Sequence, residues 1–299
     1  MDHDREQAPD AETSVSDGGA EGQPHLPTEM LAEVAKHLAT ANPAETVKNL
    51  VKFAAVSKSA REVVYDDPAF TTFWRQLDRL RTAAKGLHSL DLPDADLDDI
   101  TWAAGPTLKF LSGAEQSAVV DRILSGSDVE RQALAINLMA DHIGDLGGGN
   151  RTRLIERAFE LFEQHNPVYD PDLPSVGSTL VRAYGYLDRD QKVRFLNAMA
   201  NHPARAQYFA NAVASHSTDH SNSLPPSEPA AVTQSSHLDN SITAIEASVD
   251  ELIRDNTIVP DETIDVIYAV SVSINSAYDH ARRELRDASR TRDRSTLAR

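Results

Sequence analysis

The chain has 299 residues, of which 40% are hydrophobic and 25% charged, enough apolar material for one sizeable core or two smaller ones. No stretch approaches the roughly 18 consecutive apolar residues of a membrane span, and the acidic N-terminus lacks the apolar run of a secretory signal, so synthesis in a cytoplasm is expected. The formal net charge of -17 repels phosphate backbones and argues against nucleic-acid binding.

Residues 1–24 are polar and acidic, which predicts disorder. From Leu26 to Leu38, apolar residues recur at helical spacing, with a proline in the first turn. Apolar faces follow within 47–56 and again within 63–77, so residues 25–85 are expected to form three helices. A unit this small buries only about 60% of its chain surface, and its surplus of Leu, Val and Phe predicts a hydrophobic partner.

Residues 86–215 contain a weak internal repeat. Leu111, Leu146 and Leu187 each end one helical stretch and precede a short polar connector and another helix. Spacings of 35 and 41 residues fit a solenoid of helix pairs, in the size range of HEAT or armadillo repeats. An irregular helical domain is the alternative. In either case the predicted fold class is all-α.

Residues 216–238 are rich in Ser and Pro and are predicted to be a linker. Residues 239–299 are predicted to hold two helices, one with apolar residues from Ile242 to Ile253 and one that Pro260 opens. The final dozen residues are rich in Arg and are expected to be flexible.

Two N-terminal segments, LPTEMLAEV and NLVKFAAVSKSAREVV, resemble an F-box. The longer stretch LPTEMLAEVAKHLATANPAE is similar to the F-box of the VirF family, effectors that agrobacteria deliver into plant cells through a type IV secretion channel. The C-terminal stretch SINSAYDHARRELRDASRTRDRST also resembles the end of that family. The resemblance covers both ends of the chain, and residues 100–215 have no recognised counterpart.

The resemblance implies that the N-terminal helices dock on a Skp-type adaptor. The side chains implied in this contact are Leu26, Pro27, Met30, Leu31, Val34, Leu38, Leu50, Phe53, Val56 and Ser57. From the residues alone, the competing interpretation is that they form a small helical core.

The function implied by the resemblance is that of a non-catalytic adaptor effector. A host Skp-type protein would connect the F-box to cullin in an SCF ubiquitin ligase, while residues 86–215 recruit an unidentified host or effector protein for proteasomal degradation. The chain has no cysteine for a thioester or a thiolate zinc site, so catalysis would be borrowed, and no cofactor is expected. The alternatives are a Skp-binding decoy or scaffold that forms no ligase, or an enzyme within residues 100–215.

The C-terminal tail has the pattern R-x7-R-x-R-x-R, formed by Arg282, Arg290, Arg292 and Arg294. This pattern resembles the export signal of the same effector class. An exposed terminus with alternate Arg side chains can be bound by an acidic groove, which here would belong to a type IV coupling protein. The resemblance thus implies synthesis in a bacterial cytoplasm and delivery to the cytoplasm or nucleus of a host cell. A solvated basic tail is the alternative.

No metal site is predicted. Asp94, Asp96 and Asp98 have the spacing of a calcium loop, but Asp99 stands where the loop needs Gly and Gly105 where it needs Glu. A His pair in the predicted linker has no further ligand beside it, so these residues are interpreted as solvated.

Overall fold

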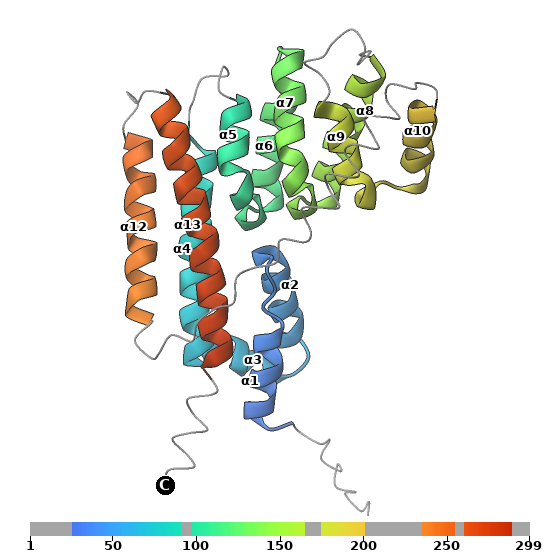
Figure 1. Ribbon diagram of the computed structural model, residues 1–299. Coiled ribbons are helices and arrows are strands. Elements are labelled where there is room, and N and C mark those ends of the chain that lie inside the picture. Colours follow the sequence, from blue (N-terminus) through green and yellow to red (C-terminus); the bar gives the residue numbers. More distant parts are fainter. Residues whose placement is uncertain (1–25, 91–96, 165–174, 201–234, 255–259, 289–299) are drawn as a thin grey trace, which may run out of the picture.

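The computed structural model describes residues 26–90, 97–164, 175–200, 235–254 and 260–288, and all their regular elements are helices (Figure 1). No strand occurs within these ranges, so the all-α prediction is confirmed. None of the helices described is both long enough and apolar enough to cross a membrane.

Three short helices form a group at one end of the molecule (Figure 1). They are α1 (Thr28–His37), α2 (Pro43–Ala54) and α3 (Lys58–Asp66). α3 packs against both α1 and α2, so it holds the group together. The next helix, α4 (Pro68–His88), continues from α3 and runs away from this end along the molecule.

Each helix after α1 in this region begins at a side-chain cap. The Asn42 Oδ1 accepts a hydrogen bond from the backbone N–H of Ala44 at 2.9 Å, and Asp67 caps α4 in the same way. Proline follows both caps, at the helical position where its missing N–H costs nothing. The cap at Asp67 corrects one expectation: the apolar stretch 63–77 was predicted as one segment, and it comprises the end of α3 and the start of α4.

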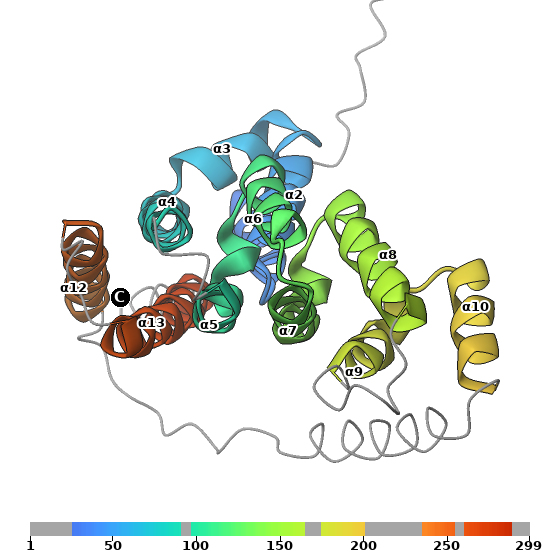
Figure 2. The ribbon, with the colours of Figure 1, turned by 90° about the horizontal axis from the view of Figure 1, so that it is seen from above.

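The central part of the chain repeats one order of elements three times: a helix, a short 3-10 helix, and a second helix. The elements are α5 (Leu97–Ala104), η2 (Gly105–Phe110) and α6 (Gly113–Ser125); α7 (Val129–Met139), η3 (Ala140–Asp145) and α8 (Gly148–Gln164); and α9 (Ser175–Arg182), η4 (Ala183–Tyr186) and α10 (Arg189–Ala200). α5, α7 and α9 stack in one row, with α6 packed on α8 behind them (Figure 2).

The three leucines that marked the sequence repeat occupy equivalent places. Leu111, Leu146 and Leu187 each follow the 3-10 helix directly and are buried. Each has extended backbone, with ψ of 147°, 145° and 137°, so each turns the chain from one helix to the next. The assignment to the HEAT or armadillo class stays a prediction.

The two C-terminal helices pack on α4, far away in the sequence. α12 (Ser235–Arg254) begins inside the range predicted as linker, and α13 (Pro260–Asp287) contacts α4, α5 and η2. An ion pair joins Arg79 of α4 to Glu246 of α12, with 2.5 Å between Nη2 and Oε2. Helices α4, α12 and α13, which lie far apart in the sequence, therefore pack together in one helical body.

Tyr278 of α13 lies at the centre of this body and is fully buried. Its ring packs edge to face on Phe110 at 5.5 Å between centroids and is tilted on Phe73 at 6.2 Å. Its hydroxyl donates to the Thr40 carbonyl at 3.0 Å and lies 2.8 Å from the Thr46 Oγ1. Tyr278 of α13 thus makes apolar contacts with α4 and η2 and polar contacts with the α1–α2 turn and with Thr46 of α2.

Candidate protein-docking surface

α1 and the residues just before it present a stripe of large apolar side chains to solvent. Leu26, Met30 and Val34 are 54%, 54% and 48% exposed. Met30 and Val34 are four residues apart and lie on one face of α1, because a turn takes 3.6 residues, whereas Leu26 lies two residues before the helix begins. The buried residues of α1 include Leu31 and Ala35, so the core uses a different face. A row of exposed large apolar residues is typical of a surface that binds another protein.

A second exposed apolar group lies where α2 ends. Val51 is exposed on the helix, and Val56, in the link to α3, is 77% exposed. Phe53 lies between them in the sequence but is half-buried against the core. The N-terminal helices therefore expose apolar side chains at two places, on α1 and at the end of α2.

The structure divides the ten side chains assigned to Skp binding. Leu26, Pro27, Met30, Val34 and Val56 are exposed. Leu31 and Leu50 are buried in the core, whereas Leu38 and Phe53 are partly buried and pack against it. Ser57 caps α3, since its Oγ accepts a hydrogen bond from the Ala60 N–H at 3.0 Å. The exposed side chains of this set are accessible to a partner, whereas the buried and partly buried ones belong to the core or pack against it.

Sequence reasoning missed two exposed apolar side chains in these helices, Val51 and Tyr65 of α3. Val51 falls within the predicted apolar face of residues 47–56, and the sequence predicts no exposed role for Tyr65. Hydrophobic periodicity identifies a face but does not say whether it points to the core or to solvent. No signal in the sequence would have separated Val51 from its buried neighbour Leu50.

Contacts from α13 hold the end of α1, and with it the exposed apolar stripe, in a fixed position. The guanidinium of Arg286, in the last turn of α13, donates to the Ala39 carbonyl at 2.7 Å, just beyond the end of α1. Together with the Tyr278 contacts, this hydrogen bond fixes the α1–α2 turn to the body. A partner would meet α1 in a preformed position, which lowers the entropy cost of binding.

Of the four arginines in the predicted export pattern, only Arg282 lies within the described residues. Its Nη2 pairs with the Asp279 Oδ1 at 2.9 Å on α13, and its side chain is largely covered. Arg290, Arg292 and Arg294 lie outside the described residues. The pattern therefore begins inside a packed helix.

Comparison with known proteins yields no match, whether to family models, to curated proteins or to solved structures. Within the part of the chain that the structure describes, no group of three or more His, Asp or Glu side chains is placed to hold a metal ion. The candidate site is thus defined by shape and exposure alone.

Proposed function

We propose that this chain is an F-box-type adaptor whose helices α1–α3 bind a Skp-type protein. The observation that supports this proposal is the exposed stripe of Leu26, Met30 and Val34, because an accessible apolar helix face is what a hydrophobic groove on a partner can bury. It occurs on the segment whose sequence resembles an F-box.

The free energy of burying these apolar side chains sets how strongly they could hold a partner. Complete burial of one Leu, Met or Val side chain contributes about 1.5–3 kcal/mol. Association costs roughly 4–15 kcal/mol in lost translational and rotational freedom, so several such side chains must be buried together. Leu26, Met30, Val34 and Val56 are 48–77% exposed, so each would contribute part of its full burial free energy, and further contacts would have to supply the rest.

The remainder of the proposal follows from the resemblance. The central helices would hold a second protein near the ubiquitin-transfer machinery, which raises its effective concentration at the reacting site. The Arg-rich tail would direct type IV export from the bacterium into a plant cell. The adaptor would supply no catalysis of its own.

The test is binding of the purified chain to a purified plant Skp-type adaptor by isothermal titration calorimetry. The variant Met30→Asp/Val34→Asp puts charge into the stripe without touching the core, and we expect binding at least tenfold weaker. The matched control is Val193→Asp/Leu196→Asp, which changes two equally exposed apolar residues of α10 and should bind as the wild type does. Both variants should keep the helical content of the wild type by circular dichroism.

Failure of the wild type to bind, or equal binding by the stripe variant, would remove the adaptor proposal. A second titration with cullin added separates an adaptor from a decoy. A ternary complex is expected of an adaptor, whereas a decoy would hold the Skp-type protein and exclude cullin.

A further inference from the structure

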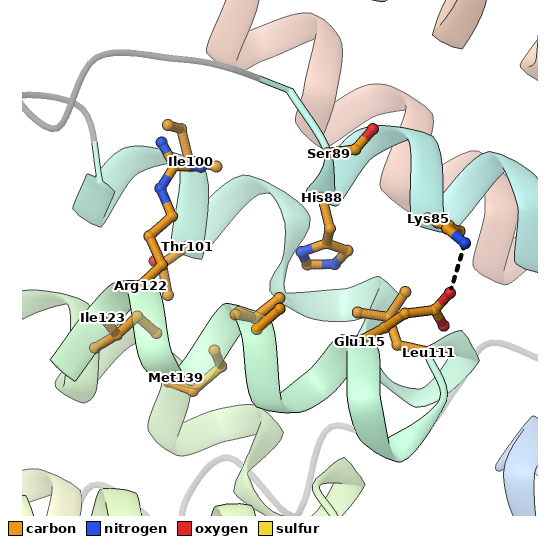
Figure 3. A pocket seen from close by; sticks show the side chains of 12 residues that line it. Lys85, His88, Ser89, Ile100, Thr101, Leu111, Glu115, Arg122, Ile123 and Met139 are labelled. Atoms are coloured by element: carbon orange, nitrogen blue, oxygen red, sulfur yellow. Dashed lines mark ion pairs between the residues drawn. The ribbon is translucent and has the colours of Figure 1, made fainter. Parts of the chain in front are cut away.

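A cavity of about 350 Å³ lies where the end of α4 meets α5 and α6 (Figure 3). It lies in the central part of the chain, away from α1–α3, and has no part in the proposed Skp contact. Its volume falls within the range of about 300–1,000 Å³ typical of small-molecule sites. A cavity of about 150 Å³ already holds a benzene molecule, so this one has room for a bicyclic body.

The walls of the cavity are mostly apolar. The apolar side chains that line it are Ile100, Leu111, Ala118, Val119, Ile123 and Met139. They come from α5, α6, α7 and the turn before α6, so neighbouring elements of the first two repeat units surround the space. Such walls favour a ligand with an apolar body, because the transfer of apolar surface out of water is favourable.

The charged side chains that line the cavity already have partners. The Lys85 Nζ lies 3.1 Å from the Glu115 Oε1 (Figure 3). The other carboxylate oxygen of Glu115 accepts a hydrogen bond from the Ser112 N–H at 2.8 Å. The Arg122 Nη1 donates to the Leu90 carbonyl at 3.4 Å, and Arg122 makes a further interaction as well. A charged group on a ligand would have to displace one of these partners and lose its own hydration, so the cavity favours an uncharged ligand.

His88 has an unused hydrogen-bond acceptor at the cavity. Its Nε2 lies 3.0 Å from the Thr107 Oγ1, whose hydroxyl donates to the Ala104 carbonyl at 2.7 Å. Since that hydroxyl hydrogen is already used, the imidazole hydrogen is on Nε2 and is donated to Thr107. Burial lowers the pKa of His88 to about 4, so near neutral pH the ring is uncharged and its Nδ1 is an acceptor. Within the described ranges Nδ1 makes no hydrogen bond, whereas the Ser89 hydroxyl and Thr101, which also line the cavity, both have partners.

We propose that this cavity binds a small uncharged molecule with an apolar bicyclic body and one N–H or O–H group, which donates a hydrogen bond to the His88 Nδ1. Figure 3 shows the imidazole projecting from the end of α4 toward the space between α5 and α6, where the apolar body would lie. The observations that carry the proposal are the apolar walls, the pairing of the charged lining side chains and the acceptor on His88. The proposal does not depend on Skp binding, because it is tested on the isolated full-length chain.

The experiment compares two isomers, 3-methylindole and 1-methylindole, by ligand-detected NMR and calorimetry near neutral pH. They have the same size, but only 3-methylindole has an N–H group. We expect 3-methylindole to bind with a dissociation constant below about 1 mM and roughly fivefold more tightly than 1-methylindole, because only the former can donate to His88. Indole-3-carboxylate, which has a charge in place of the methyl group, should bind roughly tenfold more weakly than 3-methylindole. Equal binding of the two isomers, binding of the carboxylate as tight as that of 3-methylindole, or binding of none of them at millimolar concentration would overturn the proposal.

Two variants locate the ligand. His88→Phe removes the acceptor and should abolish the preference for 3-methylindole, while 1-methylindole binds as it does to the wild type. Ala118→Phe, at an exposed position of the lining, should fill part of the cavity and weaken binding of both isomers roughly tenfold. Val193→Phe on α10 is the control for an added aromatic ring and should bind as the wild type does. With helical content unchanged by circular dichroism, undiminished binding by Ala118→Phe, or a preference that persists in His88→Phe, would contradict the assigned site.

Discussion

The Tyr278 hydroxyl is a single group whose removal should weaken the join between the last helix and the α1–α2 turn. Tyr278→Phe keeps the ring contacts but leaves the Thr40 carbonyl and the Thr46 hydroxyl with one partner fewer. A buried hydrogen bond lost in this way costs about 1–2 kcal/mol of unfolding free energy. Urea denaturation measures it, with Thr46→Val and the double variant completing a cycle. Additive effects of the two changes would contradict a direct bond.

His88 should make stability depend on pH between about 6.5 and 4. Burial lowers its pKa from 6.5 to about 4, so within this interval the unfolded chain binds a proton that the folded chain does not. The free energy of unfolding therefore falls as the pH decreases through 6.5, by about 2 kcal/mol at pH 5, and this loss levels off below 4. Urea unfolding at pH 7 and pH 5 should detect the change in the wild type and much less in His88→Gln.

Protonation of Glu115 changes the free energy of unfolding at a lower pH than protonation of His88 does, so the two effects can be measured separately. Hydrogen bonds from the Ser112 backbone and side chain, followed by the Lys85 ion pair, lower the pKa of Glu115 to about 2. Its contribution to stability is complete above its ordinary pKa of 4.5 and is lost as the pH falls toward 2. A His88→Gln variant that kept the full wild-type loss between pH 7 and pH 5 would show that another group is responsible.

For single residues, the sequence predicted which positions of α1 and α2 are apolar but not which of them are buried and which are exposed. Met30 and Leu31 are adjacent and similarly apolar, yet Met30 is exposed and Leu31 is buried. The division depends on where α3 and α13 pack, and α13 lies more than 200 residues away in the sequence. Local periodicity carries no information about such a contact.

Between elements, Gln116 of α6 joins two successive repeat units. Its Nε2 donates to the carbonyls of Leu108 at 3.1 Å and Asp145 at 3.0 Å, and its Oε1 accepts from the Gly147 N–H at 2.9 Å. Gln116→Leu would leave these backbone groups without that partner, so we expect a loss of about 2–4 kcal/mol. Gln164→Leu, at the exposed end of α8, is the control. Chemical denaturation that gave both variants one midpoint would refute the bridging role.

The sequence predicted the repeat because a leucine recurs at the same place in each unit. Leu111, Leu146 and Leu187 are apolar residues that each must be buried at a chain reversal, so their recurrence was visible in the sequence. The 3-10 helices before them were not predicted, because segments of four to six residues have no distinctive hydrophobic period. The boundary at Asp67 was missed for a related reason: apolar residues continue across it, and only the Asp-Pro pair indicates the break.

For the molecule as a whole, the structure predicts that α13 is needed for the fold of the N-terminal half. Deletion of residues 260–299 would uncover Phe73 and Phe110, which pack on Tyr278. We expect the truncated chain to lose cooperative thermal unfolding and near-UV circular dichroism, because one shared core is disrupted.

The control is deletion of residues 289–299 alone, which removes three arginines of the predicted export pattern and leaves α13 complete. Its melting temperature should match that of the full chain. A cooperative transition in the longer deletion would mean that α1–α4 fold without the C-terminal helices.

Because α13 packs against α4 but is synthesised much later, this contact also affects how the chain folds during synthesis. A ribosome adds roughly 5–20 residues per second, so the stretch from the end of α4 at His88 to the start of α13 at Pro260 takes roughly 10–30 s to make. Throughout that interval the α4 surface that will meet Tyr278 has no partner. We therefore expect a chaperone to bind the nascent chain until α13 has been synthesised.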